Sequence, residues 1–437
     1  MISKIYERIL CKQMIAYMNN KLSPLLCGFR KGYNTQHPLI RLVETFRSSL
    51  DKGEDIALLL MDLSKAYDCL DHGPIVTKFR AYGFGIKSIL LVYSYLKNRN
   101  QRVRVGQALS KWKEIIMGVP QGSVMGPLLF NIFLNDIFLF INNDGITNYA
   151  DDNGLFASNK DIRIALDVVK NEAAILNTWF QNNLMVANTG KYNLLTFGCN
   201  DYHNINVNNH NIQETKIGDI KNKKLLGITF DNKLNFDDHI TIICKNASKK
   251  LYAIRRISKF LNREKLVLVI NSFVFSNFCY CPLIWMNCSR KSNSKINKIQ
   301  ERALRIMYND YSSDYQELLD KDNSITFHQR NLQHLSVEIY KTKMGLNPPF
   351  MRDIFSENIE CKYNTRSGQH LVLPRTNTSK YGLGSLKYMG YKTWNNIPAT
   401  IKKLNDLASF KVGIKTWKGE HCDCKLCRTY IPSLGYI

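Results

Sequence analysis

The chain has few acidic residues for its number of basic ones. Its 437 residues include 36 Asp and Glu against 60 Lys and Arg, which gives a formal net charge of +24. Such an excess is typical of proteins that bind polyanions, above all nucleic acids, and a basic surface kept for solubility is the alternative. Residues 221–310 alone hold 18 basic and 6 acidic residues. This concentration favours nucleic-acid binding.

The sequence also lacks a signal peptide, a regular array of cysteines and an uninterrupted apolar run of membrane-spanning length. Residues 1–8 are largely polar, and most of the 12 cysteines are scattered singly. We therefore expect a reducing compartment, the nucleus or the cytoplasm. The most apolar stretch, residues 266–286, is interrupted by Asn271, Ser276 and Pro282. It predicts a buried helix that ends near Pro282, and no membrane span.

Length and composition exclude both a disordered chain and a single small module. Hydrophobic residues make up 45% of the sequence, enough to bury apolar cores over most of its length. At this length we expect about two to three domains. Strands that alternate with helices over residues 56–230 predict an α/β or α+β sheet domain, followed by a basic helical region at 236–310.

Several elements of this sheet domain follow from apolar periodicity. An unbroken apolar run at 56–61 predicts a strand buried on both faces. Turn residues at 151 and 152 between two short apolar segments predict a hairpin. The predicted helices cover residues 86–99, 128–141 and 161–187, and the predicted strands cover residues 56–61, 146–150, 154–157, 191–197 and 225–230.

Three aspartates lie at the ends of these predicted strands. Asp62 follows the apolar run directly, and Asp151 and Asp152 form the tip of the hairpin. If the strands are neighbours, the carboxylates converge and raise one another's pKa. Divalent cations would resolve this repulsion, and Mg²⁺ prefers such oxygen ligands. Solvated turn aspartates would explain Asp151 and Asp152, but they leave Asp62 unexplained, so we favour a metal site for phosphoryl transfer.

Four motifs follow one another in a fixed order. They are Met61-Asp-Leu-Ser-Lys-Ala-Tyr-Asp68, Gly118-Val-Pro-Gln-Gly-Ser-Val-Met-Gly-Pro-Leu128, Tyr149-Ala-Asp-Asp152 and Leu226-Gly-Ile-Thr-Phe-Asp231. Together they resemble the reverse transcriptases of non-LTR retrotransposons, especially the jockey-like group, over about residues 1–310. The resemblance implies an RNA-directed DNA polymerase that uses an RNA template, a DNA primer and deoxynucleoside triphosphates.

The resemblance also implies an α+β right-hand polymerase. Residues 1–51 would be partial fingers, 52–235 the palm, 236–310 a helical thumb, and 311–437 a C-terminal region with a short Cys/His tail. Such a chain begins partway through the fingers, and no constellation of His, Asp and Glu typical of an endonuclease precedes the palm. We therefore expect no endonuclease activity from this chain.

The family's site residues map onto this sequence as follows. Asp62, Asp151 and Asp152, with the backbone carbonyl of Leu63, would hold two Mg²⁺ ions, with Mn²⁺ as an alternative. Tyr67 matches the aromatic gate that excludes a 2′-hydroxyl group, for which a core tyrosine is the alternative.

Five further positions complete the predicted site. Gln121 and Gly122 would support the template and the incoming nucleotide, where an ordinary turn is the alternative. Arg30 and Lys65 would lie near the triphosphate, although a solvated arginine explains Arg30 equally well. Lys191 would protonate the leaving pyrophosphate.

Two regions toward the C-terminus carry separate hypotheses. The basic segment from Lys245 to Lys259 predicts a helix with one face toward phosphates. His421, Cys422, Cys424 and Cys427 form a single Cys/His cluster, and a structural zinc site usually needs two, so we favour free thiols.

Two functions from different classes remain open. The first is an active polymerase whose palm is intact. The second is a truncated or co-opted relic that binds nucleic acid without catalysis. The aspartates favour the first function, and the absent first fingers motifs favour the second.

Overall fold

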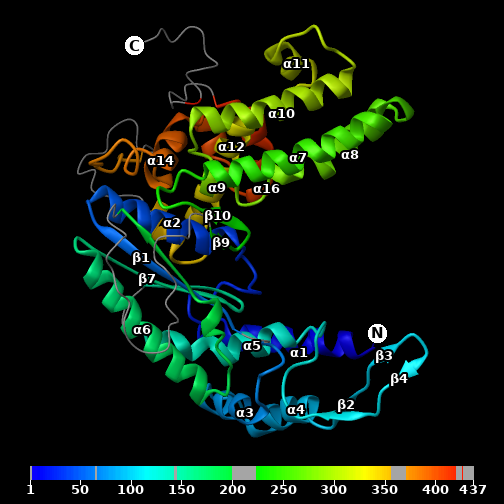
Figure 1. The fold of residues 1–437 in the computed structure, drawn as a ribbon, viewed down its shortest axis with the longest axis vertical. Coiled ribbons are helices and arrows are strands. Elements are labelled where there is room, and N and C mark those ends of the chain that lie inside the picture. The colour runs from blue at the N-terminus through cyan, green and yellow to red at the C-terminus, as the bar shows by residue number, and fades with distance from the viewer. Residues whose placement is uncertain are drawn as a thin grey trace. The chain divides into compact units, whose positions relative to one another are not determined.

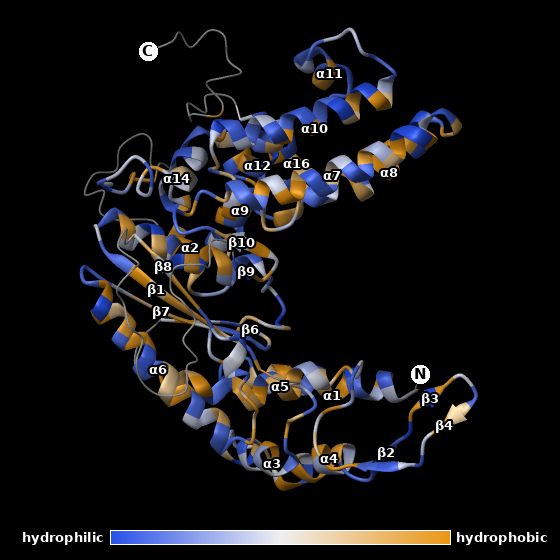
Figure 2. Ribbon diagram, in the orientation of Figure 1, coloured by the Kyte–Doolittle hydropathy of each residue, from blue (hydrophilic) through white to orange (hydrophobic). Residues whose placement is uncertain are grey.

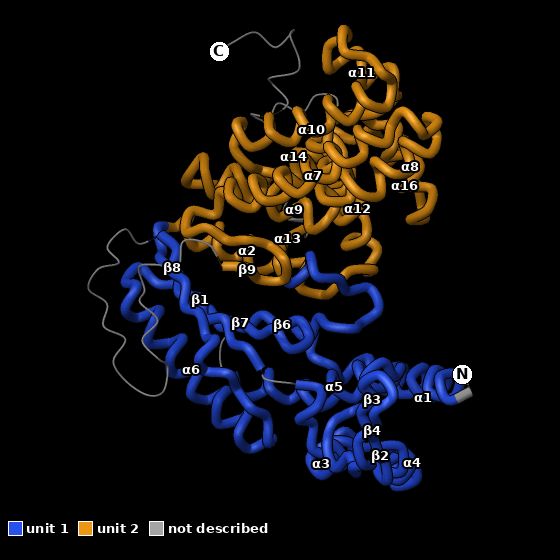
Figure 3. Tube along the Cα trace, turned by 45° about the vertical axis from the view of Figure 1, so that its right-hand side comes forward, with its two compact units in different colours: residues 1–38, 53–219 blue, residues 39–52, 220–437 orange. Residues whose placement is uncertain are grey.

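The computed structural model describes residues 2–63, 66–141, 145–198, 223–355, 371–419 and 426. They belong to two compact units, the first of residues 1–38 and 53–219 and the second of residues 39–52 and 220–437 (Figure 3). The fingers, palm and thumb boundaries stay predictions, because a division by compactness does not test them.

A four-stranded antiparallel sheet organises the first unit (Figure 1). The strand order is β6-β7-β1-β8, which places the apolar run of β1 between two neighbours. Ile56 to Leu59 are buried, as expected for an interior strand, and Figure 2 shows the hydrophobic colour of β1. The strands are β1 (Asp55–Met61), β6 (Ile146–Tyr149), β7 (Asp152–Asn159) and β8 (Asn193–Phe197).

Helices pack around this sheet and complete its core. Helix α6 (Ile162–Asn182) contacts β1 and β7 and buries Leu166, Leu176 and Phe180. Its first turn is capped by Asp161, whose side chain accepts a hydrogen bond from the Arg163 N–H. The other helical segments of this unit are α1 (Ile2–Met18), α3 (His72–Ala81), α4 (Ile86–Leu96), α5 (Gly126–Leu134), η1 (Asn135–Leu139) and η2 (Thr189–Lys191).

Two short two-stranded ladders follow α4 and form an arm of the first unit. Strand β2 pairs with β5, and β3 pairs with β4. Apolar side chains such as Val105 and Trp112 are exposed along this arm. Its strands are β2 (Arg99–Gln101), β3 (Arg104–Val105), β4 (Ala108–Leu109) and β5 (Lys113–Ile115).

The second unit is largely helical. Helices α7 (Asp237–Ile257) and α10 (Arg290–Tyr308) pack against each other, and both contact α8 (Arg263–Phe273). Preceding them is a hairpin of β9 (Lys223–Leu225) and β10 (Ile228–Phe230). The remaining segments are η3 (Ser258–Phe260), η4 (Phe275–Phe278), α9 (Pro282–Trp285), α11 (Tyr315–Lys321), α12 (Phe327–Lys343), α13 (Met351–Phe355), α14 (Leu386–Asn396), α15 (Ala399–Lys402) and α16 (Leu407–Thr416).

Helix α2 (Gln36–Asp51) is fixed to the C-terminal part of the second unit by two carboxylates. Glu44 accepts hydrogen bonds of 2.8 and 3.0 Å from the N–H groups of Leu386 and Lys387, at the start of α14. Asp51 accepts hydrogen bonds from the N–H and hydroxyl groups of Thr378, both at 2.7 Å. A segment from near the N-terminus is therefore part of the C-terminal core.

The α+β class and most predicted elements are confirmed, but several predicted boundaries are wrong. The helix predicted at 86–99 ends at Leu96, and Arg99 belongs to strand β2. The strand predicted at 191–197 begins at Asn193, after the 3₁₀ segment that contains Lys191.

The helix predicted at 128–141 narrows to a 3₁₀ segment at Asn135, whose side chain bonds the Ser23 N–H and the Lys21 carbonyl. The helix predicted at 161–187 ends at Asn182. The strand predicted at 225–230 is a hairpin, because Leu226 and Gly227 adopt positive φ angles of 45° and 82°.

The single helix predicted from 266 toward 282 is also wrong. It ends at Phe273, where Ser276 and Asn277 bond the carbonyls of the preceding turn, and Pro282 starts the separate helix α9. Within the described residues, no helix combines the length and apolar character that crossing a membrane requires.

Candidate active site

Strand register brings the three aspartates of the first unit to one end of the sheet. In the antiparallel pair of β1 and β7, Met61 lies opposite Asn153. Continuing this register by one residue places Asp62 opposite Asp152. Two segments about 90 positions apart in the sequence therefore deliver carboxylates to the same strand ends.

A tight hairpin presents Asp151 and Asp152. Tyr149 pairs with Asp152 across the β6–β7 ladder, which leaves Ala150 and Asp151 as the two turn residues. Ala150 has a φ of 56°, in the left-handed region that two-residue hairpins require. Tyr149 therefore ends β6, Ala150 and Asp151 form the turn, and Asp152 begins β7.

Two buried asparagines hold this turn in place. The Asn148 amide donates to the Ala150 carbonyl at 2.9 Å and to the Asn153 Oδ1 at 2.8 Å. Asn153 in turn donates to the Asp151 carbonyl at 3.2 Å. Sequence reasoning missed both residues, although polar side chains at buried strand positions beside the turn were a usable signal.

The aspartates interact electrostatically. The pKa of the Asp152 carboxyl is raised, because the surrounding protein desolvates it and because the negative charges of Asp151 and Asp62 oppose its ionisation. Asp62 is also close enough to Tyr192 to help raise the pKa of that phenol, after burial as the main cause. These couplings support the predicted convergence of the three carboxylates.

Lys191 forms an ion pair with Asp62. Its Nζ lies 3.2 Å from Asp62 Oδ2, and both side chains keep contact with solvent. The backbone aligns the two segments, since the Asn188 N–H donates to the Asp62 carbonyl at 3.0 Å and Leu63 bridges to Ala187. The structure thus brings together two residues that the sequence assigned to one site.

The donor set suits a hard divalent cation only in part. Carboxylate oxygens are the preferred ligands of Mg²⁺, and polymerase-type sites use one or two of them together with substrate phosphates. Among the described residues, however, no three His, Cys, Asp or Glu side chains lie close enough together to hold a metal ion by themselves. The aspartates therefore fit a cation that is also held by the phosphates of a nucleotide.

Tyr67 lies beside the hairpin turn, where a gate residue would be expected. Its ring stacks on Phe130 at a centroid distance of 4.5 Å and meets Phe29 edge-on at 6.2 Å. Burial raises the pKa of the Tyr67 phenol, and the charge of Asp151 adds to the effect. Among the described groups, none forms a hydrogen bond with the buried Tyr67 hydroxyl. Packing therefore fixes the ring, which is what a steric gate needs.

The loop that contains Gln121 and Gly122 is tied to the segment after Tyr67. Gln121 Nε2 donates to Asp68 Oδ1 at 2.9 Å, and the Val119 N–H donates to the Tyr67 carbonyl at 3.1 Å. Gly122 has a φ of 78°, a conformation that glycine adopts without strain. The loop is thereby held beside the predicted gate.

Two residues that sequence reasoning missed, His72 and Arg99, anchor Gly118 at the start of this loop. Gly118 has a φ of 80°, and a Cβ there would lie 2.8 Å from the Asp68 carbonyl oxygen. The Gly118 carbonyl is held by His72 Nε2 at 3.0 Å and by Arg99 Nη2 at 2.6 Å. These contacts join segments that are far apart in the sequence, so no local sequence pattern predicts them.

Arg30 stabilises its own loop. Its Nη1 donates to the carbonyls of Ser23 at 2.5 Å and Leu26 at 3.1 Å, and its guanidinium lies 4.4 Å from the centre of the Tyr33 ring. A triphosphate contact by Arg30 remains a prediction, as does the role of Lys65, which falls outside the described residues.

The same loop packs directly against the YADD turn. A Cβ on Gly28 would lie only 2.6 Å from the Ala150 nitrogen, so a glycine is needed for this approach. The Asn131 amide donates to the Gly28 carbonyl at 2.7 Å, and Leu26 bridges to Asn148. The predicted fingers loop therefore supports the carboxylate-bearing hairpin. The Cys/His cluster from His421 to Cys427 lies outside the described residues.

Comparisons with known proteins identify the family of this chain. The family described as "Reverse transcriptase (RNA-dependent DNA polymerase)" matches residues 1–230. The chain is 24% identical over 323 residues to "Probable RNA-directed DNA polymerase from transposon BS" of Drosophila melanogaster, covering 70% of this chain and 35% of that protein. It is 26% identical over 318 residues to "RNA-directed DNA polymerase from mobile element jockey" of the same organism, covering 70% and 34%.

The chain thus spans about a third of the length of these curated relatives. Among solved structures, an apo telomerase from Candida tropicalis matches with a TM-score of 0.39 and 13% identity, over 75% of this chain and 55% of the telomerase chain.

Proposed function

Because this chain belongs to the reverse transcriptase (RNA-dependent DNA polymerase) family, we propose that it extends a DNA primer on an RNA template with deoxynucleoside triphosphates. The observation that carries this proposal is the register of β1 and β7, which sets Asp62 opposite Asp152 beside Asp151. The raised pKa of Asp152 supports it, because that shift comes partly from the other two carboxylates.

In this proposal each residue has a separate task. Asp62, Asp151 and Asp152 would hold divalent cations at the strand ends, with the Leu63 carbonyl as a further ligand. The same cations would bind the phosphates of the nucleotide. When bound, two Mg²⁺ or Mn²⁺ ions would lower the pKa of the primer 3′-hydroxyl and stabilise the leaving pyrophosphate. Lys191, which forms an ion pair with Asp62 in the free chain, would give a proton to the leaving pyrophosphate.

The remaining site residues would position the nucleotide. The packed ring of Tyr67 would exclude a 2′-hydroxyl group, and the loop of Gln121 and Gly122 would support the template base. Hydrogen bonds from His72 and Arg99 keep this loop in place. Rigid positioning of this kind supplies much of the catalysis in phosphoryl transfer.

A basic groove in the second unit supports nucleic acid as a partner. A cavity of about 560 Å³ between α7 and α10 is lined by Lys249, Arg255 and Arg302. Tyr252 and Tyr311 also line it, and their side chains are 68% and 58% exposed. Cations contact phosphates and tyrosines stack on bases, so this groove suits a primer and template strand.

The alternative is a relic that binds nucleic acid without catalysis. One observation favours it, since Lys191 forms an ion pair with Asp62, one of the carboxylates that would have to bind a cation. In the active enzyme, nucleotide binding would have to separate Lys191 from Asp62.

Primer extension separates the two functions. The chain is incubated with oligo(dT) annealed to poly(rA), dTTP and Mg²⁺, and extension is followed on a gel. Asp151→Asn should lower the rate at least about a hundredfold, since metal sites contribute several kcal/mol. Binding of the same duplex, measured by anisotropy, should change less than about twofold because Asp151 contacts no phosphate without a cation.

Asp167→Asn is the matched control, because Asp167 is an exposed carboxylate of the same unit, on α6. It should extend the primer like the wild type. A wild-type chain that binds the duplex but does not extend it would support the relic and refute the polymerase.

A further inference from the structure

The arm formed by strands β2 to β5 is exposed along almost its whole length. Every residue from 100 to 114 is exposed, so none of these side chains belongs to the core of the first unit. A two-stranded hairpin without a packed face is only marginally stable in water. The arm nevertheless carries large apolar side chains, since Val105, Leu109 and Trp112 are 74%, 50% and 61% exposed. Exposed apolar groups of this kind mark a surface that binds a partner.

Hydrogen bonds join the inner ladder of β2 and β5 and the outer ladder of β3 and β4 into one bent hairpin. The Ser110 N–H donates to the Val103 carbonyl at 2.9 Å, and the Ser110 hydroxyl accepts from the Val103 N–H at 2.9 Å. The register of the outer ladder differs by one residue from that of the inner ladder, which leaves Lys111 as a bulge residue. Gly106, with a φ of 61°, begins the two-residue turn at the tip. The backbone therefore gives the arm an extended shape.

The arm carries four cations around one indole. The Arg102 guanidinium lies 4.6 Å from the centre of the Trp112 ring. Arg104 lies two positions further along the same strand, and Lys111 and Lys113 flank the tryptophan in the facing strand. Within the described part of the chain, no carboxylate forms an ion pair with any of these four side chains. Their charge is therefore available to an anionic partner.

This composition suits a single strand of nucleic acid. Residues 99–115 include five basic residues and one acidic residue, Glu114. Cations contact phosphates and an exposed aromatic ring stacks on a base, which is the combination that binds unpaired strands. A duplex keeps its bases in the stack, so it would leave the indole without a partner. A membrane surface favours an apolar face that is separate from the cations, whereas Arg102 lies directly against Trp112.

The arm starts and ends beside the loop that we predict to support the template. Strand β5 ends at Ile115, three residues before Gly118, and Arg99 at the start of β2 donates to the Gly118 carbonyl at 2.6 Å. Gln121 and Gly122 follow directly. From this base the arm extends away from the sheet of the first unit, with β3 and β4 at its outer end (Figure 1). A template strand on the loop would therefore have the arm next to it.

We infer that the arm binds the unpaired RNA template ahead of the aspartates, with one base stacked on Trp112 and phosphates at Arg102 and Arg104. The identity of the strand rests on the proposed function, but the binding requires neither the aspartates nor a nucleotide. The arm would keep the template single-stranded before it is copied.

Binding of two labelled RNA–DNA duplexes to the full chain tests this inference. One duplex is blunt, and the other has the same paired region and a 5′ RNA overhang of about ten nucleotides, a length within the range that single-strand sites cover. Fluorescence anisotropy without Mg²⁺ or nucleotide measures both dissociation constants. The wild type should bind the overhang duplex about tenfold more tightly, since stacking and phosphate contacts are added to the duplex contacts.

Two arm variants should remove most of this preference. Trp112→Ala and, separately, Arg102→Ala/Arg104→Ala should each reduce it from about tenfold to less than about threefold, with blunt-duplex binding changed less than about twofold. Trp112→Phe keeps an aromatic ring and should retain the preference. All three side chains are exposed, so their replacement leaves the core intact.

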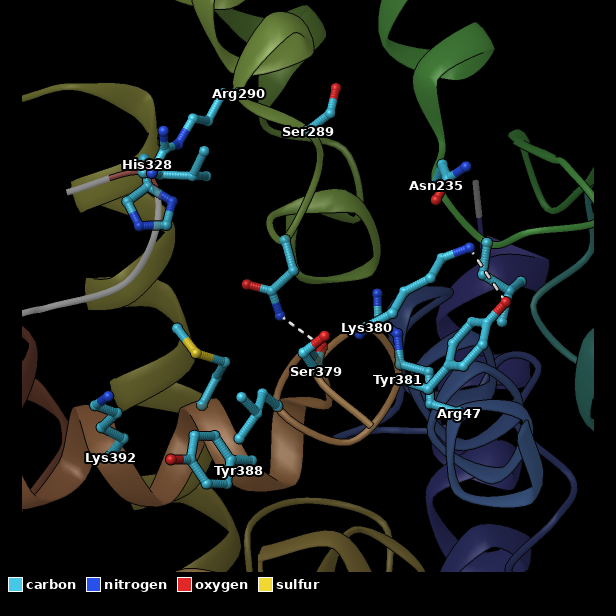
Figure 4. A pocket seen from close by; sticks show the side chains of 16 residues that line it. Arg47, Asn235, Ser289, Arg290, His328, Ser379, Lys380, Tyr381, Tyr388 and Lys392 are labelled. Carbon is cyan, nitrogen blue, oxygen red and sulfur yellow. Dashed lines mark hydrogen bonds between the residues drawn. The ribbon is translucent and has the colours of Figure 1, made fainter. Parts of the chain in front are cut away.

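A cation and an aromatic ring in the second unit supply the matched control. Lys380 Nζ lies 4.7 Å from the centre of the Tyr381 ring and donates to its hydroxyl oxygen at 3.2 Å, and both residues line a cavity of about 420 Å³ (Figure 4). Lys380→Ala and Tyr381→Ala remove groups of the same kind outside the arm. Both variants should keep the wild-type preference for the overhang.

Three results would overturn the inference. Equal affinity of the wild type for the two duplexes would show that the chain has no single-strand site. Equal weakening of both duplexes by the arm variants would assign the arm to paired nucleic acid. An unchanged preference in both arm variants would place the single strand elsewhere, and loss of binding to phosphatidylserine vesicles by Trp112→Ala would then assign the arm to a membrane.

The test is independent of catalysis. Asp151→Asn should show the wild-type preference for the overhang, because Asp151 lies outside the arm. A chain that prefers the overhang but does not extend oligo(dT) on poly(rA) refutes only the polymerase. A chain that extends the primer without this preference refutes only the role of the arm.

Discussion

Lys191 Nζ lies 3.2 Å from Asp62 Oδ2, although the two residues are 129 positions apart. Asp62 directly follows the interior strand β1, and Lys191 ends the 3₁₀ segment that leads into the neighbouring strand β8. The hydrogen bond from Asn188 to the Asp62 carbonyl fixes this approach. The ammonium therefore partly neutralises the carboxylate that the proposed reaction needs, and it lies within reach of any phosphate bound there.

Replacement of Lys191 tests its catalytic role. Lys191→Ala removes the proposed proton donor, so the rate of single-nucleotide addition should fall by roughly two to four orders of magnitude. Lys191→Arg keeps the charge but releases a proton poorly, so it should recover only a small part of the rate. The rate is measured at saturating dTTP and Mg²⁺ in a rapid-quench experiment.

Lys170→Ala is the matched control, because Lys170 also pairs with an aspartate in the same unit, Asp167 at 3.5 Å. It should react like the wild type. If Lys191→Arg and Lys191→Ala both keep the wild-type rate, the lysine serves only to hold the Asp62 side chain in the free protein.

Tyr67 should decide between deoxyribonucleotides and ribonucleotides. Tyr67→Ala removes the ring that stacks on Phe130, so incorporation of UTP relative to dTTP should rise by roughly one to two orders of magnitude. Tyr67→Phe keeps the ring and removes a hydroxyl that has no partner among the described groups, so it should discriminate like the wild type. Equal discrimination by all three proteins would show that Tyr67 is a core residue only.

Local sequence patterns were sufficient for the carboxylate-bearing part of the site. The apolar run before Asp62 predicted an interior strand and the short apolar segments around Asp151 predicted a hairpin, and the strand pairing agrees with both. The same patterns gave wrong element boundaries where a side chain forms hydrogen bonds with backbone groups far away in the sequence. The helix predicted at 128–141 changes to a 3₁₀ segment at Asn135, whose side-chain amide forms hydrogen bonds with the backbone of Ser23 and Lys21, more than 110 positions away.

The contacts that hold the Gly118 carbonyl had no sequence signal of their own. His72 and Arg99 hold the Gly118 carbonyl, and both look like ordinary helix or strand-end residues. The attachment of α2 to the C-terminal part was equally unpredictable, because Asp51 meets Thr378 across 327 positions. Contacts of this kind depend on the assembled core, which periodicity does not encode.

Glu44 should be needed for the stability of the second unit. Glu44→Ala leaves the buried Arg47 without this carboxylate and the first N–H groups of α14 without their acceptor. Breaking a buried ion pair in this way typically costs about 3–5 kcal/mol of unfolding free energy. Urea unfolding of the full chain, followed by circular dichroism, measures the change.

Two further variants separate the ion pair from the helix itself. Thr45→Ala changes an exposed neighbour on α2 and should shift stability by less than about 0.5 kcal/mol. The double variant Glu44→Leu/Arg47→Leu should recover much of the loss, because apolar pairs often replace buried ion pairs without cost. If Glu44→Ala unfolds at the same urea concentration as Thr45→Ala, the attachment of α2 contributes nothing to stability.

His239 should make the second unit sensitive to acid. Burial lowers the pKa of this imidazole from 6.5 to about 4, and the positive charge of Lys224 adds to the effect. Its Nδ1 accepts a hydrogen bond from the Thr229 N–H at 3.4 Å, which requires the neutral ring. Between pH 6.5 and 4, the unfolded chain therefore binds a proton at His239 that the folded chain does not bind.

The folded state should accordingly lose stability as the pH falls through this window, by up to about 1.4 kcal/mol per pH unit from this one site. His239→Gln retains a hydrogen-bond acceptor for Thr229 but takes up no proton. Its unfolding free energy, measured in urea at pH 8, 6, 5 and 4.5, should fall less steeply than that of the wild type below pH 6.5. Parallel curves for the two proteins would show that His239 is protonated equally in the folded and unfolded chains.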